Sequence, residues 1–532
     1  MLLYQMLRDY VKKGEKDEAL LYLGKSINFG TLIRSIDDAA ARLSSFVKAG
    51  DVVTICMPNT PECVYCFYAV NRLGAVAHMV HPLAPKAQLS KFMAAAKSKL
   101  LITLSINLEK YAEIAKDYPI ISVHPAQSLS PVLRFLFNLK NRPYKGDKTN
   151  ITDYSKLRKA DLPPEPSRDE KTTGVYLHSG GTGGEPKIIE LSDFAVNMLA
   201  KRGPAALDLS AEKARGMYML AALPMFHGFG LAMGIHTSLV HGVISVLMPK
   251  FDQNTAVKLI KKNKLNILIG VPNLFRALLR RPDFNGDMLK NIYVGFVGGD
   301  CAPQDLLDEF NARMEGAGAR GRLFEGYGLT ETVTVCAVNN HSYNRRGSMG
   351  RMLEGLKAAV VEPEKNEPLP IGEKGELVFA GDTVMNGYLD NEAENSRVFI
   401  DIGGEKYVRS GDFGYMDGDG YLYFIQRLKR IIKISGISVY PKEIETVAKS
   451  IEGIAEACAV EYKTGGKTKI ALFYTGEQKS EADIKAKIES ELSRYAVPTL
   501  VKNIDAIPVT PVMKADTRAL EKVAVEISES VK

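Results

Sequence analysis

The sequence predicts an α/β fold, with a large N-terminal domain of α/β subdomains and a small β-barrel-like subdomain, followed by a small C-terminal α+β domain. The length of 532 residues suggests several compact units, since a domain has roughly 150 residues. Apolar runs of strand length alternate with helical patterns over much of the chain, which favours parallel sheets. From Gly375 the runs become shorter and are joined by tight turns, and after Gln426 the pattern changes again.

The first alternation of strand and helix patterns begins near the N-terminus. Residues 52–57 and 75–80 are apolar runs, and residues 62–73 between them have a helical pattern. This order predicts a β-α-β unit. Cys63 and Cys66 form a C-x-x-C pair in the predicted helix, without the second ligand pair of a zinc site or the setting of a redox motif. We expect both cysteines to be packing residues.

A second alternation in the middle of the chain extends the α/β pattern. Helices are predicted around residues 256–263 and 272–281, and strands at residues 267–271 and 292–297. The last of these strands ends in a Gly-Gly pair. Strands separated by helices in this way predict further parallel β-α-β units.

The remaining elements define the predicted domain boundary. Residues 376–379 and 421–425 are predicted to be short strands of the β-rich block. After Gln426 the sequence predicts a small mixed domain with strands at 431–434, 455–461 and 470–474 and helices at 441–450 and 481–494. We therefore predict an N-terminal domain at residues 1–426, a hinge at 427–430 and a C-terminal domain at 431–532.

Charge, cysteine content and hydropathy limit the class of protein. The formal net charge is +7, but basic and acidic residues are interleaved, so anionic small molecules fit as ligands and nucleic acid is not indicated. Six scattered cysteines do not form a disulfide framework. No apolar stretch reaches the roughly 18 residues of a membrane span, and residues 1–16 are charged rather than signal-like. We expect a cytoplasmic protein.

Residues 134–145, RFLFNLKNRPYK, mix basic and apolar side chains more densely than the rest of the chain. Two interpretations fit this segment: a solvated surface helix that ends at Pro143, or a short amphipathic segment with weak membrane-surface contact. The segment is short for an interfacial anchor, which favours the solvated helix. The membrane contact stays open as the alternative.

A glycine-rich loop at residues 179–187, SGGTGGEPK, follows the apolar run 174–177. Glycines allow consecutive backbone N–H groups to close around an anion, hydroxyls add donors, and a lysine supplies a positive charge. The loop therefore suits a polyphosphate. It is not a Walker A loop, because Pro186 stands where that motif has Gly and Ile188 where it has Ser or Thr. A glycine-rich surface turn is the alternative for this loop alone.

Further motifs follow one another along the chain. They are LPMFHGFGL at 223–231, FEGYGLTE at 324–331, GSMGR at 347–351, GEL at 375–377, MNGYL at 385–389, YVRSGDFG at 407–414, RLKR at 427–430, KISG at 433–436 and PVTPVMK at 508–514. Together with the loop at 179–187, this ordered set resembles the adenylate-forming superfamily of acyl-CoA synthetases, nonribosomal adenylation domains and beetle luciferases. The resemblance covers residues 51–520, nearly the whole chain.

The resemblance implies that the glycine-rich loop binds the triphosphate of ATP. The residues carried over are Ser179, Gly180, Gly181, Thr182, Gly183 and Lys187. Gly183 stands where the superfamily has a Thr, so the loop has one hydroxyl donor fewer and its phosphate contacts are expected to be weaker.

The resemblance also assigns the nucleotide pocket. Tyr327 would stack on adenine, with Gly299 and Gly328 in the same pocket. Thr330 would meet the α-phosphate and act in catalysis, and Glu331 would help to hold Mg²⁺. These roles suit displacement at the α-phosphate, which needs fixed donors for its oxygens and a metal for the leaving pyrophosphate.

In the C-terminal motifs, the resemblance assigns Asp412 and Arg427 to the ribose. It implies that Lys433 and Gly436 complete the nucleotide site. It also implies that residues 427–430 form the pivot of a mobile small domain. Arg430 occupies a position that is commonly acidic. Lys514 would be the catalytic cation, since an ammonium group can bridge the attacking carboxylate and the α-phosphate.

The motif at 223–231 resembles the segment beside the acyl pocket, where His227 would act on the substrate. Residues 229–235 contain no acidic side chain that could bind an amino group. An amino-acid substrate is therefore disfavoured, and the apolar residues fit an aliphatic or aryl acid. A histidine packed in the core is the alternative for His227.

We therefore predict a carboxylate:CoA ligase that uses ATP, Mg²⁺ and coenzyme A to convert a small-molecule carboxylic acid, of the fatty or aryl type, into its acyl-CoA. Two alternatives remain: an acyl-AMP ligase that loads a carrier protein, and a non-catalytic nucleotide-binding homologue, suggested by the missing Thr of the phosphate loop. The sequence indicates neither the acid nor the oligomeric state.

Overall fold

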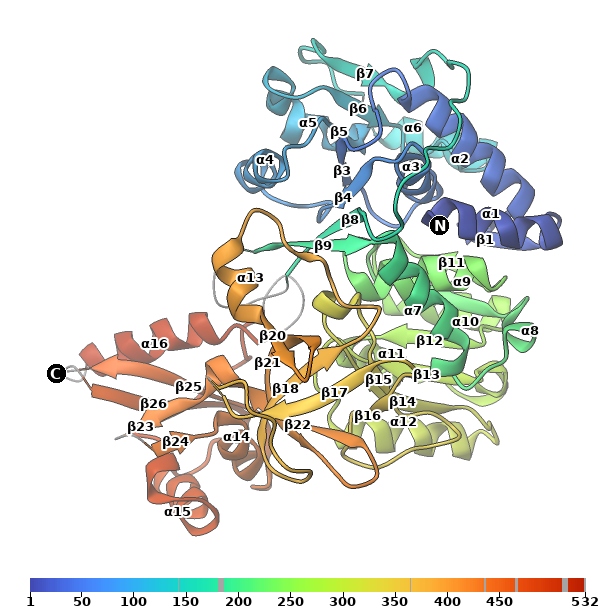
Figure 1. The fold of residues 1–532 in the computed structure, drawn as a ribbon. Coiled ribbons are helices and arrows are strands. Elements are labelled where there is room, and N and C mark those ends of the chain that lie inside the picture. Colours follow the sequence, from blue (N-terminus) through green and yellow to red (C-terminus); the bar gives the residue numbers. More distant parts are fainter. Residues whose placement is uncertain are drawn as a thin grey trace. The chain divides into compact units, whose positions relative to one another are not determined.

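The computed structural model describes residues 1–141, 143–179, 186–363, 365–434, 437–464, 467–509 and 515–530. They form two compact units (Figure 1). The first unit comprises residues 1–179, 186–358 and 379–408, and the second comprises the described part of 359–378 and 409–530. The first unit is a large α/β structure and the second is smaller, with mixed helices and strands, so the predicted fold class is confirmed.

One sheet of the first unit grows around the predicted β-α-β unit. The strands β3 (Val52–Cys56) and β4 (Val76–Met79) are parallel and joined by α3 (Pro61–Arg72). Cys63 and Cys66 are buried in α3. The strand order is β19 (Gly387–Tyr388), β9 (Ile188–Ser192), β8 (Thr173–His178), β4, β3, β5 (Leu100–Leu104), β6 (Ile120–Val123) and β7 (Ile151–Asp153). Only the contacts of β9 with its two neighbours are antiparallel.

The strands of the second sheet within the first unit follow the order β16 (Gly350–Met352), β15 (Ala337–Val338), β14 (Arg322–Tyr327), β13 (Val294–Val297), β12 (Ile267–Gly270), β10 (Tyr218–Ala221), β11 (Ile244–Leu247), β1 (Glu18–Tyr22) and β2 (Lys25–Asn28). From β14 to β1 all neighbouring strands are parallel. The carboxyl ends of parallel strands share one edge of a sheet, where ligands of α/β proteins usually bind. The motif at 223–231 follows β10, Gly299 follows β13, and the motif at 324–331 continues beyond β14.

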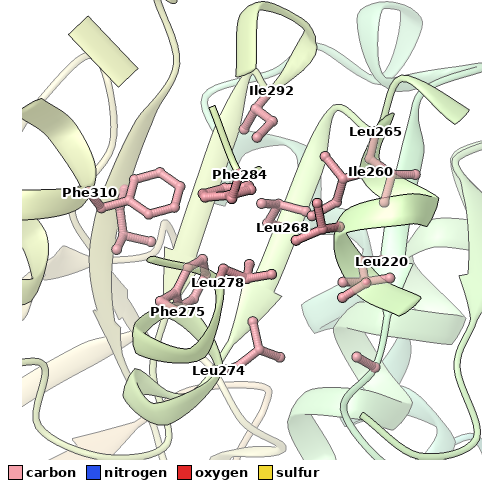
Figure 2. Packing of buried hydrophobic residues seen from close by; sticks show 14 of the residues in the cluster. Leu220, Ile260, Leu265, Leu268, Leu274, Phe275, Leu278, Phe284, Ile292 and Phe310 are labelled. Atoms are coloured by element: carbon pink, nitrogen blue, oxygen red, sulfur yellow. The ribbon is translucent and has the colours of Figure 1, made fainter. Parts of the chain in front are cut away.

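A core of mostly aliphatic side chains, together with Phe275, Phe284 and Phe310, includes residues of α10 (Gln253–Asn263), α11 (Pro272–Leu279) and α12 (Gln304–Gly316); Figure 2 shows part of it. The rings of Phe275 and Phe310 meet edge to face with centroids 5.6 Å apart, and Phe284 lies 5.9 Å from Phe310. Such aromatic pairs add to the free energy gained from apolar burial. The predicted helices and strands of this region are present, with ends shifted by up to three residues.

The other α-helices of the first unit are α1 (Leu3–Gly14), α2 (Phe29–Leu43), α4 (Lys86–Ala95), α5 (Leu108–Tyr111), α6 (Pro131–Lys140), α7 (Asp193–Ala206), α8 (Ala211–Ala214), α9 (Ser238–Val240) and α13 (Glu392–Val398). The helix expected in the basic and apolar segment is α6, which ends before Pro143 because Asn141 already has an extended backbone. Within the described residues, no helix is long and apolar enough to cross a membrane.

The β-rich block contains β17 (Lys357–Val361), β18 (Gly375–Ala380), β21 (Glu405–Met416) and β22 (Tyr421–Arg427), adjacent in that order, and β20 (Phe399–Ile402), which pairs with β21. The C-terminal part of the second unit has β23 (Ile432–Ile434), β24 (Ile437–Val439), α14 (Pro441–Lys449), β25 (Ile454–Thr464), β26 (Lys467–Gly476), α15 (Glu481–Glu491), β27 (Leu500–Asn503) and α16 (Thr517–Ser530). β25 and β26 are longer than their apolar runs predict, because cross-strand pairing continues to Thr464 and Lys467.

Candidate functional site

The two described ends of the glycine-rich loop are held together at the junction of β8 and β9. The Ser179 N–H donates to the Lys187 carbonyl oxygen at 2.9 Å, and the Lys187 N–H donates to Ser179 Oγ at 3.0 Å. These bonds continue the antiparallel pairing of His178 with Ile188. Residues 180–185 lie outside the described residues. The loop therefore leaves and returns to the sheet at one point.

A chain of contacts connects Lys187 to the predicted metal ligand. The Lys187 ammonium forms an ion pair with Glu394 of α13 and lies 4.6 Å from the centre of the Tyr388 ring. The Tyr388 hydroxyl donates to Glu331 Oε1 at 2.9 Å. Cation–π and hydroxyl–carboxylate contacts of this kind restrict the side chains that make them. The base of the phosphate loop and Glu331 therefore belong to one polar cluster within the first unit.

Thr330 and Glu331 lie in a short 3₁₀ turn (Thr330–Thr332) that ends in a strained residue. Val333 has φ 66° and ψ −56°, and the Thr334 N–H donates to the Thr332 carbonyl at 2.8 Å. These values define the rarer, strained form of the γ-turn, which is unusual for a β-branched residue. Backbone strain of this kind concentrates at ligand sites, where the surrounding structure maintains it.

Two glycines allow this turn to pack closely on neighbouring segments. A Cβ atom on Gly328 would lie 1.4 Å from the Thr334 carbonyl oxygen, and one on Gly228 would lie 2.1 Å from the Val333 carbonyl oxygen. No side chain fits at either position without movement of the backbone. The predicted acyl-pocket motif thus packs directly on the backbone of the turn that follows the predicted nucleotide-pocket motif at 324–331.

Tyr327 and Gly299 lie at the ends of neighbouring parallel strands. The Tyr327 ring lies 5.5 Å from the Phe379 ring, and its carbonyl accepts a hydrogen bond from the Cys336 N–H at 2.9 Å. Gly299 has φ 78°, a left-handed conformation that favours glycine. Just beyond it, the Ala302 N–H donates to Glu325 Oε1 at 3.1 Å, and burial raises the pKa of Glu325 to about 7.

His227 lies in the segment that follows β10, just before the π-helix. Its ring lies 5.4 Å from the Phe226 ring, which lies 4.6 Å from the His81 ring. The next residues form a π-helix (Phe229–Thr237) that is buried along its whole length and contains no acidic residue. π-helical turns are rare and often occur at functional sites. The Phe229 ring meets Phe296 of β13 edge to face at 6.1 Å, so the segment forms an apolar wall.

In the second unit, Asp412 and Arg427 face each other across the antiparallel strands β21 and β22. Arg427 Nε lies 2.9 Å from Asp412 Oδ1, and the Asp412 side chain is only 1% exposed. Ser410 Oγ accepts a hydrogen bond from the Asp412 N–H at 2.9 Å and donates to the Leu377 carbonyl at 2.6 Å. Strand pairing therefore brings together the two residues predicted to bind ribose.

A second ion pair follows directly after β22. Residues Leu428–Arg430 form a 3₁₀ turn, and Arg430 contacts Glu445 of α14 at 2.6 Å. The unusual basic residue at this position thus has an acidic partner in the second unit. Lys433 lies on β23 opposite Ser438 in the strand register. Gly436 and Lys514 lie outside the described residues.

The chain can be compared with known proteins through its sequence. Residues 7–389 match the sequence profile of AMP-binding enzymes, which covers well over half of the chain. The chain belongs to this family. The family match includes the loop at 179–187, the motif at 223–231 and the motif at 324–331.

This AMP-binding enzyme resembles CoA ligases over nearly its whole length. It is 28% identical to the long-chain-fatty-acid–CoA ligase of Bacillus subtilis (strain 168), over 97% of this chain and 94% of that protein. It is 27% identical to 4-coumarate–CoA ligase 2 of Petroselinum crispum, over 89% and 85% of the two chains.

Solved structures of the same fold also cover nearly the whole chain. ATP-bound MatB from Rhodopseudomonas palustris superimposes with a TM-score of 0.86 at 21% identity, over 99% of this chain and 100% of that one. O-succinylbenzoate CoA synthetase from Bacillus subtilis, in complex with ATP and magnesium ion, gives 0.78 at 22% identity, over 97% and 98%. These likenesses establish the fold.

The predicted site residues of this AMP-binding enzyme are distributed over both units. In the first unit lie Ser179, Lys187, His227, Gly299, Tyr327, Gly328, Thr330 and Glu331, and in the second lie Asp412, Arg427 and Lys433. Gly180, Gly181, Thr182, Gly183, Gly436 and Lys514 are outside the described residues. Within those residues, no group of three or more His, Cys, Asp or Glu side chains is arranged to hold a metal.

Tyr388, Glu394 and Glu325 make contacts in this region that the sequence motifs did not indicate. Tyr388 belongs to the MNGYL motif, but its partner Glu331 lies 57 residues away, so no local pattern connects them. Glu325 belongs to the FEGYGLTE motif, whose residue types gave no sign that burial would shift its pKa. An acidic residue at the end of a strand that carries a ligand motif is the signal that could have indicated Glu325.

Proposed function

We propose that this AMP-binding enzyme is an ATP-dependent carboxylate:CoA ligase. In the first half-reaction, a carboxylate oxygen attacks the α-phosphorus of ATP and pyrophosphate leaves, which forms acyl-AMP. In the second, the sulfur of coenzyme A attacks the acyl carbon, AMP leaves and the thiol proton is lost to solvent. The observation that carries the proposal is the cluster of Lys187, Tyr388 and Glu331, which joins a phosphate-loop cation to a carboxylate suited to Mg²⁺.

The residues present fit ATP and Mg²⁺. Mg²⁺ at phosphate sites is commonly held by one or two carboxylates together with phosphate oxygens and water. The Tyr388 hydroxyl bonds Glu331 at Oε1, so one donor orients a carboxylate that has two oxygens. When bound, Mg²⁺ would neutralise the charge that develops on pyrophosphate.

The proposed roles of the other first-unit residues follow from their positions. The loop at 179–187 holds the triphosphate, Thr330 donates to the α-phosphate, and Tyr327 stacks on adenine beside Gly299. Glu325 ties the segment after Gly299 to β14 through the Ala302 N–H. The glycine contacts of the γ-turn support these roles, because they hold the backbone of the turn in one position.

We propose a fatty or aryl acid as the substrate. The buried π-helix (Phe229–Thr237) and its contact with Phe296 supply an apolar wall without an acidic side chain. Apolar pockets with a few polar groups bind such acids. The relatives named as long-chain fatty-acid and 4-coumarate ligases support the same substrate class. His227 would contact the acyl group at the start of this wall.

We also propose that residues 427–430 are the hinge between an N-terminal domain at 1–426 and a C-terminal domain at 431–532. Asp412 and Arg427 would bind the ribose next to this hinge, with Lys433 and Gly436 beyond it. Lys514 would approach the α-phosphate during adenylation and withdraw before coenzyme A attacks. Rotation of a small domain about a few residues is a common way to alternate between two catalytic states.

The proposal is tested by measuring pyrophosphate release from ATP and Mg²⁺ with a panel of short, long-chain and aryl acids, with and without coenzyme A. We expect acid-dependent release and, with coenzyme A, formation of acyl-CoA and AMP. Thioester on a holo-carrier protein but not on coenzyme A would instead show a carrier-loading acyl-AMP ligase. ATP binding without pyrophosphate release for any acid would show a non-catalytic homologue.

A further inference from the structure

Helix α6 (Pro131–Lys140) differs from the other α-helices of the described residues in having no buried residue. It begins at Ser130, whose Oγ accepts a hydrogen bond from the Leu133 N–H at 3.5 Å, and it has proline at its first position. Both features favour a helix start. The helix is therefore locally well specified, although none of its side chains enters the core.

The apolar face of α6 is directed away from the protein. Val132, Phe135, Leu136 and Leu139 are 68%, 63%, 53% and 68% exposed, and their spacing of i, i+3, i+4 and i+7 places them on one face. We call these four residues the α6 stripe. The opposite side of α6 contacts the rest of the first unit. The Phe137 ring lies 5.8 Å from the His124 ring, and Arg134 Nε donates to the Ala126 carbonyl at 3.0 Å.

An apolar stripe of a globular protein normally faces the core, because burial of apolar surface stabilises the fold. In α6 the arrangement is reversed, so folding of this chain does not explain the stripe. A continuous exposed apolar patch usually marks a surface for a membrane or another protein. The stripe therefore requires an apolar environment outside the unit that carries it.

The charges around α6 distinguish between these partners. Residues 118–146 contain no Asp or Glu, whereas Arg134, Lys140, Arg142 and Lys145 are basic. A two-fold contact between two copies of α6 would bring like charges together, which is unfavourable. An anionic bilayer supplies both an apolar boundary and negative headgroups for the exposed cations Lys140 and Lys145.

We propose that α6 lies on the surface of an anionic membrane, with the α6 stripe at the boundary between headgroups and acyl chains. A helix of ten residues gives weak, reversible binding, which suits an enzyme that collects amphipathic molecules from a bilayer and returns to solution. The proposal rests on α6 alone and holds whether or not the chain is a CoA ligase.

The test uses the full-length protein and sedimentation with vesicles of phosphatidylcholine, alone or mixed with phosphatidylglycerol. We expect the protein to bind the mixed vesicles about tenfold more tightly than the neutral vesicles. Binding to the mixed vesicles should weaken as salt is added. Phe135→Ser with Leu139→Ser should reduce binding to mixed vesicles about tenfold by removing the bulk of the stripe. Lys140→Glu with Lys145→Glu should abolish the preference for anionic vesicles.

The matched control is Leu162→Ser with Ile371→Ser, which removes two exposed apolar side chains elsewhere and should leave binding within about twofold of the original protein. Circular dichroism and thermal melting establish that each variant is folded. Absence of binding by the original protein, or equal binding by the Phe135 and Leu139 variant, overturns the proposal. A dimer that this variant converts to a monomer, without vesicle binding by either protein, would assign the stripe to a second copy of the chain.

Discussion

Two carboxyl groups of the first unit lie in different surroundings. Glu331 accepts a hydrogen bond from Tyr388, and Glu325 accepts one from the backbone of Ala302. Glu325 is also buried, and burial raises its pKa to about 7. Replacement of Glu325 or of the Tyr388 hydroxyl should therefore affect different properties of the enzyme.

Replacing Glu325 by Gln should change how stability depends on pH. A carboxyl group with a raised folded pKa favours folding while it is protonated. This contribution is fully present below the ordinary pKa of 4.5 and is lost as the pH rises through the folded pKa of about 7. Across that interval we expect the free energy of unfolding of the original protein to fall by up to about 3 kcal/mol relative to Glu325→Gln.

Urea unfolding at pH 5 and pH 8 measures this difference. Glutamine keeps an acceptor for the Ala302 N–H but does not ionise. Glu113→Gln is the control, because Glu113 is exposed and its pKa is lowered by a hydrogen bond from Lys86. Identical pH dependence of the original and Glu325→Gln proteins would contradict the prediction.

Replacing Tyr388 by Phe should weaken the response to Mg²⁺. The variant loses the hydroxyl that orients Glu331 but keeps the ring beneath Lys187. Loss of a group that orients a metal ligand lowers metal affinity or activity about 10- to 100-fold. We expect the Mg²⁺ concentration for half-maximal pyrophosphate release to rise in this range, with a change in unfolding free energy of about 1 kcal/mol.

The comparison variant is Tyr423→Phe, which removes a hydroxyl that donates to Asp417 at 3.0 Å in a surface hairpin. That variant should keep the original Mg²⁺ response. An unchanged Mg²⁺ response in Tyr388→Phe would show that the hydroxyl does not position Glu331 for metal binding.

Among the elements, two irregular segments shape the proposed site. The γ-turn at Val333 follows the motif carried by β14, and the π-helix (Phe229–Thr237) begins within the motif at 223–231, after β10. Gly228 and Gly328 allow both segments to approach within backbone contact. Parallel strands bring these loops to one edge of the sheet, and glycines then set how closely they pack.

Replacing Gly328 by Ala should displace the γ-turn, because its Cβ would lie 1.4 Å from the Thr334 carbonyl oxygen. We expect a loss of about 1–3 kcal/mol of unfolding free energy from overpacking. A shift of about 1 Å in the turn should also slow pyrophosphate release about 100-fold. Urea unfolding and steady-state kinetics measure the two effects.

Gly316→Ala provides the matched control, since no atom lies within 4 Å of its Cβ position at the end of α12. This variant should retain full activity and stability or gain a fraction of a kcal/mol, because alanine favours a helix. Full activity of Gly328→Ala would mean that the turn does not position Thr330 and Glu331.

In the molecule as a whole, the residues of the proposed site are distributed over both units. Thr330 and Glu331 belong to the first unit, whereas Asp412 and Arg427 belong to the second. The sequence places Lys514 near the end of the chain. In the proposed two-step reaction Lys514 would act only while acyl-AMP forms, so its replacement should affect the two half-reactions differently.

Lys514→Ala should slow acyl-AMP formation far more than thioester formation from supplied acyl-AMP. We expect a loss of about 100-fold or more in the first step, because the lysine offsets repulsion between two anions. The second step should change by less than about fivefold. Single-turnover assays of each step make the comparison, and Lys502→Ala, which removes an exposed lysine of β27, is the matched control. Equal losses in both steps for Lys514→Ala would contradict its assigned role.

The α/β class, the order of most elements and the family follow from the sequence alone, because periodic apolar patterns and contiguous motifs are local properties. The sequence also indicated Ser179, Lys187, Thr330 and Glu331. Four features became visible in the folded chain: Tyr388 bonds Glu331, Arg430 pairs with Glu445, burial raises the pKa of Glu325, and the α6 stripe faces outward. These features depend on contacts between distant segments and on burial, which a linear pattern does not encode.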